Sequence, residues 1–210
     1  LSDDRSALDL RPVISAALPG ATPPQVEAIA EKAPGHPLLL RLILEDILSS
    51  PTHFTDAGFE GPVAEACIAD LAQMTVGIAW KTFVQKKINR LDRQVRRVLE
   101  IGSVQGTEFS REVTLRAAES RGIDRNTSRK ALADSAATLD LIDAAADDPE
   151  LQFRQPVYRE FLHDGLASED RRTITELVRQ MIIGEIEAAD EEDRDPTPLI
   201  LELARAHLRL

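Results

Sequence analysis

Residues 138–154 constrain the fold most, because the apolar periodicity changes here from that of helices to that of strands. Residues 138–143, TLDLID, predict a short strand, and residues 147–150, DDPE, predict a turn. Residues 151–154, LQFR, alternate apolar and polar side chains as a second strand would. Helical patterns that begin near residues 92, 110 and 127 precede this hairpin. The order of helices followed by a hairpin predicts a winged helix.

A rigid break separates two helical patterns near the start of the chain. Residues 22–25, TPPQ, are a capping box with prolines in the first turn of a helix. Pro34-Gly35 ends that helix, and Pro37 stands where a first-turn proline belongs. The next helix, to about Ser49, is apolar over most of its surface, so we expect it to be buried. We therefore predict a mainly α chain: a helical subdomain, a winged helix, and further C-terminal helices.

The composition narrows the class of protein further. Hydrophobic residues make up 43% of the chain but aromatic residues only 4%, which favours helices packed through aliphatic side chains. The single cysteine, Cys67, excludes an internal disulfide and a cysteine-based zinc site and favours a reducing compartment. No apolar run approaches the roughly 20 residues of a membrane span, and no signal-peptide pattern opens the chain. We expect a cytoplasmic protein that contacts no membrane and, because it opens on Leu1, a fragment.

Charge is distributed unevenly along the sequence. Residues 81–130 contain 13 basic and 6 acidic side chains, although the whole chain has a net charge of −11. This block leaves two interpretations open. Its charges lie on solvated helix faces, or they contact an acidic partner or nucleic acid. In the second case, residues 127–137 would be the recognition helix of a DNA-binding winged helix, with Arg125, Arg129 and Lys130 near its start.

Motifs for catalysis and metal binding are missing from the sequence. It contains no GxxxxGK[ST] or GxGxxG phosphate loop, no HExxH, and no paired cysteines or histidines at metal-ligand spacing. Its four histidines are scattered, and no local arrangement suggests an activated nucleophile. We expect no catalysis by this chain alone.

Two stretches resemble a known family. Residues 21–48, ATPPQVEAIAEKAPGHPLLLRLILEDIL, resemble the helical lid of STAND-class signalling ATPases, which are related to AAA+ proteins. The lid motif Gly-x-Pro corresponds to Gly35-His36-Pro37, and residues 10–13, LRPV, are similar to the segment that leads into the lid. Residues 88–166 resemble the winged helix that follows the lid, and the final LELARAHLRL is similar to the start of a superhelical repeat array.

The resemblance implies a nucleotide-dependent mechanism. An ATPase core elsewhere in the parent protein would bind the phosphates of ATP or ADP and Mg²⁺, while the lid closes over the base and ribose. Pro37 would then lie beside the adenine, next to His36, and Gly35 would allow close backbone approach. The family histidine that contacts the β-phosphate of ADP falls on Gln155, a departure, because glutamine donates a hydrogen bond but carries no charge. Arg154 is the neighbouring candidate, although an alternating strand should point it the other way.

A purely structural interpretation of these positions, without a nucleotide, also stays open. Pro37 would be a plain first-turn proline, and Gln155 an exposed residue that ends a strand.

The expected domains are a lid-like subdomain at residues 1–50, a connector at 51–77, a winged helix at 78–166 and a helical linker at 167–210. We expect the chain to be the regulatory part of a STAND-type ATPase. It would partner the NTPase core of the same polypeptide, self-associate and contact other proteins, and bind no cofactor when isolated.

Two alternatives remain. One is a DNA-binding transcription regulator, which the acidic flanks disfavour. The other is a helical protein–protein adaptor, which predicts no hairpin at residues 139–154 and no lid-like packing of residues 35–49.

Overall fold

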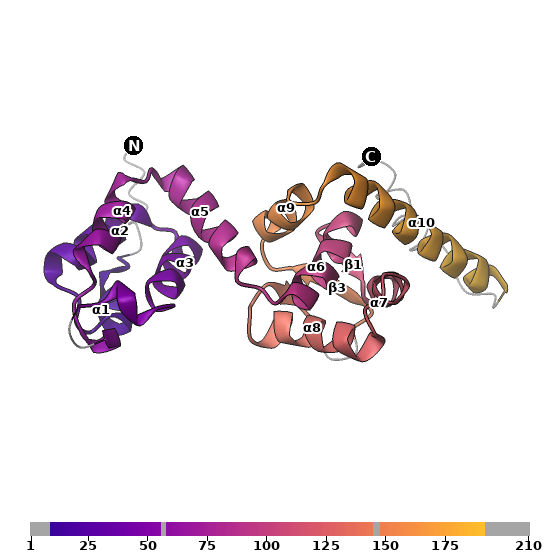
Figure 1. The fold of residues 1–210 in the computed structure, drawn as a ribbon, viewed down its shortest axis with the longest axis horizontal. Helices are drawn as coiled ribbons and strands as arrows, with labels where there is room; N and C mark the ends of the chain where they lie inside the picture. Colours follow the sequence, from indigo (N-terminus) through magenta and orange to yellow (C-terminus); the bar gives the residue numbers. More distant parts are fainter. Residues whose placement is uncertain (1–8, 56–57, 145–147, 192–210) are drawn as a thin grey trace, which may run out of the picture. The chain divides into compact units, whose positions relative to one another are not determined.

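The chain folds into two compact units, which meet between Asn89 and Arg90 in the sequence. The structure is a computed structural model, and it describes residues 9–55, 58–144 and 148–191. Both units are shown in Figure 1, coloured from indigo at the N-terminus to yellow at the C-terminus. The described residues are mainly helical and include a small antiparallel sheet. The prediction of a mainly α chain is therefore confirmed.

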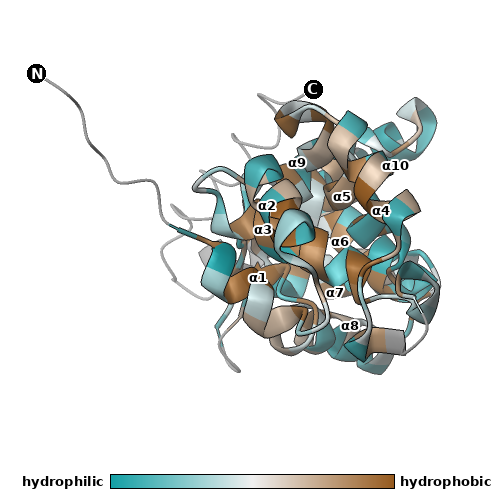
Figure 2. Cartoon of the chain, turned by 90° about the vertical axis from the view of Figure 1, so that its left-hand side faces the viewer, coloured by the Kyte–Doolittle hydropathy of each residue, from teal (hydrophilic) through white to brown (hydrophobic). Residues whose placement is uncertain are grey.

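The described residues of the first unit form helices and 3₁₀ turns, with one isolated antiparallel bridge between Phe54 and Val63. Its elements are α1 (Arg11–Ala17), α2 (Pro23–Lys32), α3 (Pro37–Ile47), the 3₁₀ turns η1 (Pro51–His53) and η2 (Gly58–Glu60), α4 (Glu65–Gln73) and α5 (Val76–Asn89). Figure 2 shows polar and apolar residues following one another along these helices, as expected for amphipathic helices that share a core. The largest fully buried side chains of this core are Ile14, Leu18, Ile29, Leu39, Ile43 and Ile47.

Side-chain hydrogen bonds hold both ends of α2, one of them within its capping box and the others to the segments around α4. The backbone N–H of Thr22 donates to Oε1 of Gln25 at 3.1 Å, which is the glutamine half of the capping box. Gln25 Nε2 also donates to the carbonyl of Val63 at 2.7 Å, so the same side chain ties α2 to the segment before α4. At the other end of α2, Lys32 donates to the carbonyls of Ala72 and Met74 at 2.7 and 2.8 Å, where α4 ends. Helix α3 is buried over most of its surface, as predicted.

The second unit combines helices with a three-stranded sheet. Its elements are α6 (Arg93–Gln105), β1 (Glu108–Ser110), α7 (Arg111–Ser120), α8 (Arg125–Ala137), β2 (Ile142–Asp143), β3 (Glu150–Phe153), α9 (Pro156–Asp164) and α10 (Ser168–Glu191). The strand order is β1-β3-β2, and both pairs are antiparallel. Helices α7, α8, α9 and α10 all contact α6, which is therefore the central helix of this unit.

Two aromatic rings join the sheet to the core of the second unit. Phe109 of β1 and Phe153 of β3 pack with ring centroids 5.0 Å apart, and both side chains are fully buried. Gly102 of α6 lies against the ring of Phe109, where a Cβ would stand 2.9 Å from two ring carbons. The absence of a side chain at Gly102 therefore lets β1 approach α6.

The sheet differs from the predicted hairpin in two ways. First, β1 adds a strand that the sequence did not reveal, because three residues are too few for an alternating pattern and their partner β3 lies about 40 residues further on. Second, the strand expected at residues 138–143 contains only Ile142 and Asp143, because Thr138 ends α8 and Asp140 has a positive φ of 56°. β2 pairs with β3, so the chain has the hairpin at residues 139–154 that the adaptor alternative did not expect.

The division into units also differs from the expected domain limits. Contacts place residues 78–89 with the first unit, because α5 packs on α3 through side chains that include Phe83, Val84 and Ile88. Residues 65–73, expected within a connector, form α4, which packs on α2. The stretch that resembles the start of a repeat array, residues 201–210, lies outside the described residues.

Candidate functional site

The tetrapeptide Pro34-Gly35-His36-Pro37 forms an exposed turn between α2 and α3. Gly35 has φ 66°, in the left-handed region that favours glycine, and a Cβ there would meet no atom within 4 Å. The N–H of His36 donates to the carbonyl of Ala33 at 3.1 Å, and the carbonyl of His36 accepts from Leu40 at 3.0 Å. His36 and Pro37 are both exposed as the N-cap and the first residue of α3. The glycine is thus needed for the turn itself, as turn chemistry predicts.

A pocket of about 330 Å³ lies beside this turn, and we call it the α1–α2 pocket. Its lining residues are Asp9, Leu10, Arg11, Glu27, Ala30, Glu31, Ala33, Pro34 and Gly35. It brings together two of the segments selected from the sequence, Leu10-Arg11 and Pro34-Gly35. Neither His36 nor Pro37 lines it, so of the expected adenine-side residues only Gly35 is at the pocket.

The rim of the α1–α2 pocket is acidic. Arg11 Nε lies 3.0 Å from Glu27 Oε2, and its guanidinium also pairs with Asp9 at 3.7 Å. Glu31 makes no ion pair with another described residue. Three carboxylates against one guanidinium leave a net negative rim, which repels phosphate and offers acceptors to hydroxyl and amino groups.

The two residues expected near the β-phosphate lie in the second unit, between β3 and α9. Gln155 is the N-cap of α9, half-buried, and its side chain makes no capping hydrogen bond. Arg154 forms ion pairs with Asp140 and, at 2.9 Å, with Asp143, and its Nε also donates to the carbonyl of Ile142 at 3.4 Å. Arg154 therefore braces the segment between α8 and β2.

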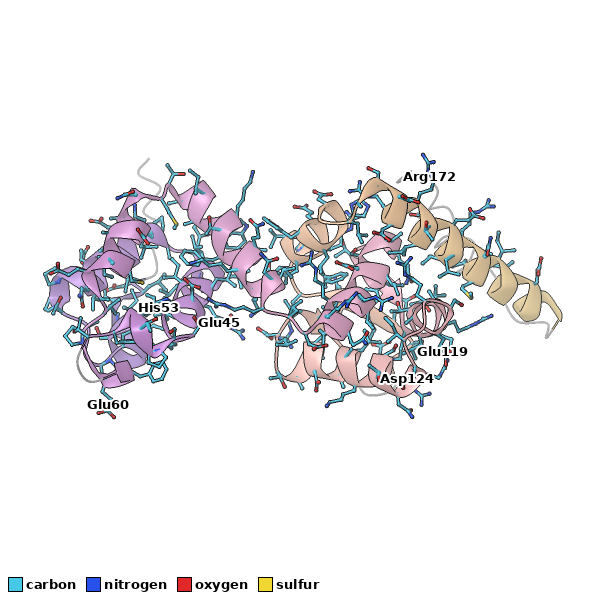
Figure 3. The ribbon with its side chains drawn as sticks, viewed as in Figure 1. Glu45, His53, Glu60, Glu119, Asp124 and Arg172 are labelled. Carbon is cyan, nitrogen blue, oxygen red and sulfur yellow. The ribbon has the colours of Figure 1, made fainter. Side chains whose placement is uncertain are left out.

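The basic residues at the start of α8 differ in what they contact. Arg125 pairs with Glu112 at 2.5 Å and with Glu119 at 3.3 Å, and the hydrogen bond to Glu112 raises the pKa of Arg125. Arg129 and Lys130 are exposed and make no ion pair with any other described residue. Asp124, the N-cap of α8, and Glu119 stand at the turn between α7 and α8 (Figure 3). Acidic groups thus surround the start of the expected recognition helix.

An open groove of about 1010 Å³ runs along α8, with Arg111 and Glu112 of α7 on one side. Its other lining residues are Asp143, Ala144, Asp148, Pro149 and Arg154. Arg129 and Arg154, which the sequence assigned to different functions, both line it. The surface that α8 gives to the groove is Arg129 followed by the alanines 133, 136 and 137. Its charged lining residues are the three arginines 111, 129 and 154 and the three acids 112, 143 and 148, so its formal charge is zero.

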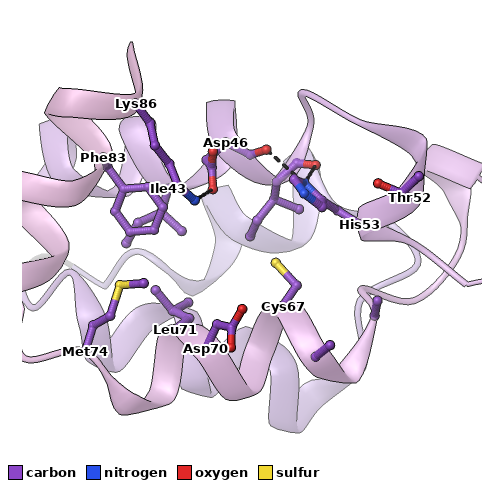
Figure 4. A pocket seen from close by; sticks show the side chains of 13 residues that line it. Ile43, Asp46, Thr52, His53, Cys67, Asp70, Leu71, Met74, Phe83 and Lys86 are labelled. Atoms are coloured by element: carbon purple, nitrogen blue, oxygen red, sulfur yellow. Dashed lines mark hydrogen bonds and ion pairs between the residues drawn. The ribbon is translucent and has the colours of Figure 1, made fainter. Parts of the chain in front are cut away.

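A cavity in the first unit was not anticipated from the sequence. It encloses about 220 Å³ between α3, η1, α4 and α5, and we call it the three-helix cavity. Figure 4 shows Cys67 and Asp70 of α4 facing Asp46 of α3 and Lys86 of α5 across this space. The carboxylate of Asp46 is 7% exposed and accepts from Lys86 Nζ at 2.8 Å.

The half-buried thiol of Cys67 is not poised as a nucleophile. Burial raises its pKa, and the nearby carboxylates of Asp46 and Asp70 add to the increase while Lys86 opposes it. A raised pKa leaves less thiolate, and the thiolate is the reactive form. These four polar residues of the cavity come from three separate helices: Asp46 from α3, Cys67 and Asp70 from α4, and Lys86 from α5. No single local motif could therefore have identified it.

Comparison with known proteins gives no match: no family model fits the chain, and no curated protein or solved structure is similar to it. Among the residues that the structure describes, no cluster of histidine, cysteine, aspartate and glutamate could hold a metal ion. In that same part of the chain, no helix combines the length and the apolar character that crossing a membrane requires.

Proposed function

We propose that this chain is the regulatory part of a STAND-type signalling ATPase. It couples the nucleotide state of an ATPase core in the parent protein to domain rearrangement and self-association, and it performs no catalysis alone. The first unit is the lid that closes over the base and ribose of ATP or ADP. The second unit is the winged helix that moves when the nucleotide changes.

The observation that carries this proposal is the composition of the α1–α2 pocket. The sequence resemblance rests on residues 10–13 and 35–37 in the first unit, and Leu10, Arg11 and Gly35 of these segments line one pocket. Its apolar lining residues, Leu10, Ala30 and Ala33, suit a flat base. Its carboxylates suit hydroxyl and amino donors and disfavour phosphates, so the phosphates must be bound by another part of the parent protein.

The second unit supports the proposal through the order of its elements. Helix α6, strand β1, helices α7 and α8, and strands β2 and β3 follow one another as in a winged helix, with β3 in the centre of the sheet. At the phosphate-sensing position, the Gln155 side chain makes no capping hydrogen bond, so its amide is available to a ligand. Arg154 is less suited to that role, because two carboxylates already hold its guanidinium.

Nucleotide binding by the 210-residue chain tests this division of the site. We expect labelled ADP to bind more weakly than micromolar, and adenosine to bind no more weakly than ADP, because the acidic rim gains nothing from the phosphates. Equilibrium dialysis or fluorescence anisotropy measures both affinities. Replacing Glu31 with glutamine removes one rim charge and should improve ADP relative to adenosine, whereas Glu65→Gln on α4, outside the pocket, should change neither. Micromolar ADP binding by the chain alone would contradict the divided site.

Sequence-specific DNA binding is a second candidate, favoured by the exposed Arg129 and Lys130 on α8. Against it, Arg125 is held by Glu112 and Glu119, and Asp124 stands at the start of the same helix. We expect no retardation of duplex DNA at physiological salt. If DNA does bind through α8, the double variant Arg129→Gln, Lys130→Gln should reduce the slope of log affinity against log salt by about 2. Retardation with that change in slope would favour this function over the first.

A further inference from the structure

The three-helix cavity lies in the first unit and shares no lining residue with the α1–α2 pocket. Its apolar wall consists of Ile43, Ile47, Leu71, Met74 and Phe83, contributed by α3, by α4 with its C-cap Met74, and by α5. Polar groups from η1, α3, α4 and α5 converge on the same space. The cavity is partly open to solvent, since Asp70 and Lys86 are exposed. A concave apolar wall with a few convergent polar groups is the usual form of a small-molecule site.

Most of the polar groups that face this cavity accept hydrogen bonds. Nδ1 of His53 lies 3.1 Å from the carbonyl oxygens of both Asp46 and Ile47, so it carries the proton and Nε2 is left as an acceptor (Figure 4). The carboxylates of Asp46 and Asp70 are acceptors as well. Lys86 is the charged donor, and it already donates to Asp46 at 2.8 Å. A ligand that complements this lining must bring N–H donors of its own.

The charged groups that line the cavity give it a net negative charge. Asp46 and Lys86 neutralise each other, whereas Asp70 makes no ion pair with another described residue. Counting histidine as neutral, as in the net charge of the chain, the lining has a formal charge of −1. Burial is the main cause of the raised pKa of Cys67, and Asp70 adds to it, which places this carboxylate within electrostatic reach of the thiol.

We propose that the three-helix cavity binds a small organic monocation: a primary amine whose ammonium group lies at Asp70 and whose short aliphatic body packs on the apolar wall. The volume sets the size of this ligand. At roughly 30 Å³ for each water-sized group, 220 Å³ holds about seven non-hydrogen atoms. Isopentylamine, with a branched five-carbon body and one amino group, is therefore a suitable probe.

Two probes of the same shape, one charged and one neutral, test this proposal on the full 210-residue chain. We expect isopentylamine to bind about fivefold more tightly than isopentanol, which has the same shape and no charge; the preference is modest because Asp70 is exposed to solvent at the mouth of the cavity. Isothermal titration calorimetry measures the two affinities. In Asp70→Asn the preference for the amine should disappear, and in the control Glu65→Gln, an equally exposed acid on the same helix that does not line the cavity, it should persist. Lys86→Met should strengthen amine binding, because it removes the positive charge from the lining.

Cys67 provides a second and independent readout, because it is the only cysteine in the chain. A bound ammonium ion near Asp70 stabilises the thiolate, so saturating isopentylamine should lower the pKa of Cys67, measured by NMR of cysteine labelled with ¹³C at Cβ. Isopentanol should leave this pKa unchanged. Equal affinities for the amine and the alcohol, or an amine that binds without moving the Cys67 titration, would overturn the proposal. Neither result depends on whether the α1–α2 pocket binds a nucleotide.

Discussion

Replacing Phe153 with alanine is expected to lower the free energy of unfolding of the second unit by about 3–5 kcal/mol. The ring is 1% exposed and packs against Phe109 at a centroid distance of 5.0 Å, so its removal leaves a cavity between the sheet and the helices. It also removes an aromatic contact between β1 and β3. Because β3 is the central strand, both pairings of the sheet should weaken together.

Hydrogen exchange of the α6 and α7 amides during denaturant titration measures this loss. Gln152→Ala is the matched control, because Gln152 is exposed on the same strand and its loss should change stability by less than about 0.5 kcal/mol. Trp80, the only tryptophan of the chain, lies in α5. Its fluorescence should report an unchanged first unit. A loss below about 1 kcal/mol in Phe153→Ala, which is the scale of an Ile→Val substitution, would mean that the two rings do not hold the sheet.

Lys86→Met is expected to destabilise the first unit by about 2 kcal/mol, whereas Lys87→Met should cost less than about 1 kcal/mol. The two lysines are neighbours on α5, and each pairs with an acid of α3 at 2.8 Å, Lys86 with Asp46 and Lys87 with Glu45. The partners differ in burial: the side chain of Asp46 is 7% exposed and that of Glu45 is 36%. Water can solvate Glu45 when its lysine is removed, but it reaches Asp46 poorly.

Urea denaturation followed by Trp80 fluorescence compares the two variants in the same helix. The double variant Asp46→Leu, Lys86→Met should recover part of the loss of Lys86→Met, because the buried carboxylate is removed together with its partner. Equal losses in the two single variants would show that burial of the acid does not decide the cost.

Local sequence signals predicted several helix ends correctly, because the groups that satisfy a helix end are close in sequence. The Gln25 arm of the capping box, the N-caps Asp92 and Ser110, and the turn at Gly35 are all present in the structure. Each depends on a contact within four residues, so the sequence alone contains the needed information. The alternation of residues 151–154 likewise predicted β3.

Features that depend on distant partners were missed or placed differently. Strand β1 exists because β3 offers it a partner and Gly102 leaves room for Phe109. Helix α5 has the apolar pattern that any packed helix would have, and its contacts with α3 place it in the first unit. The basic block at residues 81–130 gave no sign that Lys86, Lys87, Arg121 and Arg125 each have an acidic partner within the fold.

The candidate sites also combine residues that the sequence indicated with groupings that only the fold produces. The sequence selected Gly35 and the segment at Leu10-Arg11, but only packing of α1 on α2 placed them on one pocket and left Pro37 outside it. The three-helix cavity had no signal at all, because its polar groups come from separate helices. The sequence by itself determined where most helices begin and end and that a hairpin follows α8. The tertiary structure decided which helices share a unit, which charges are neutralised and which side chains face one cavity, because these depend on contacts between residues far apart in the chain.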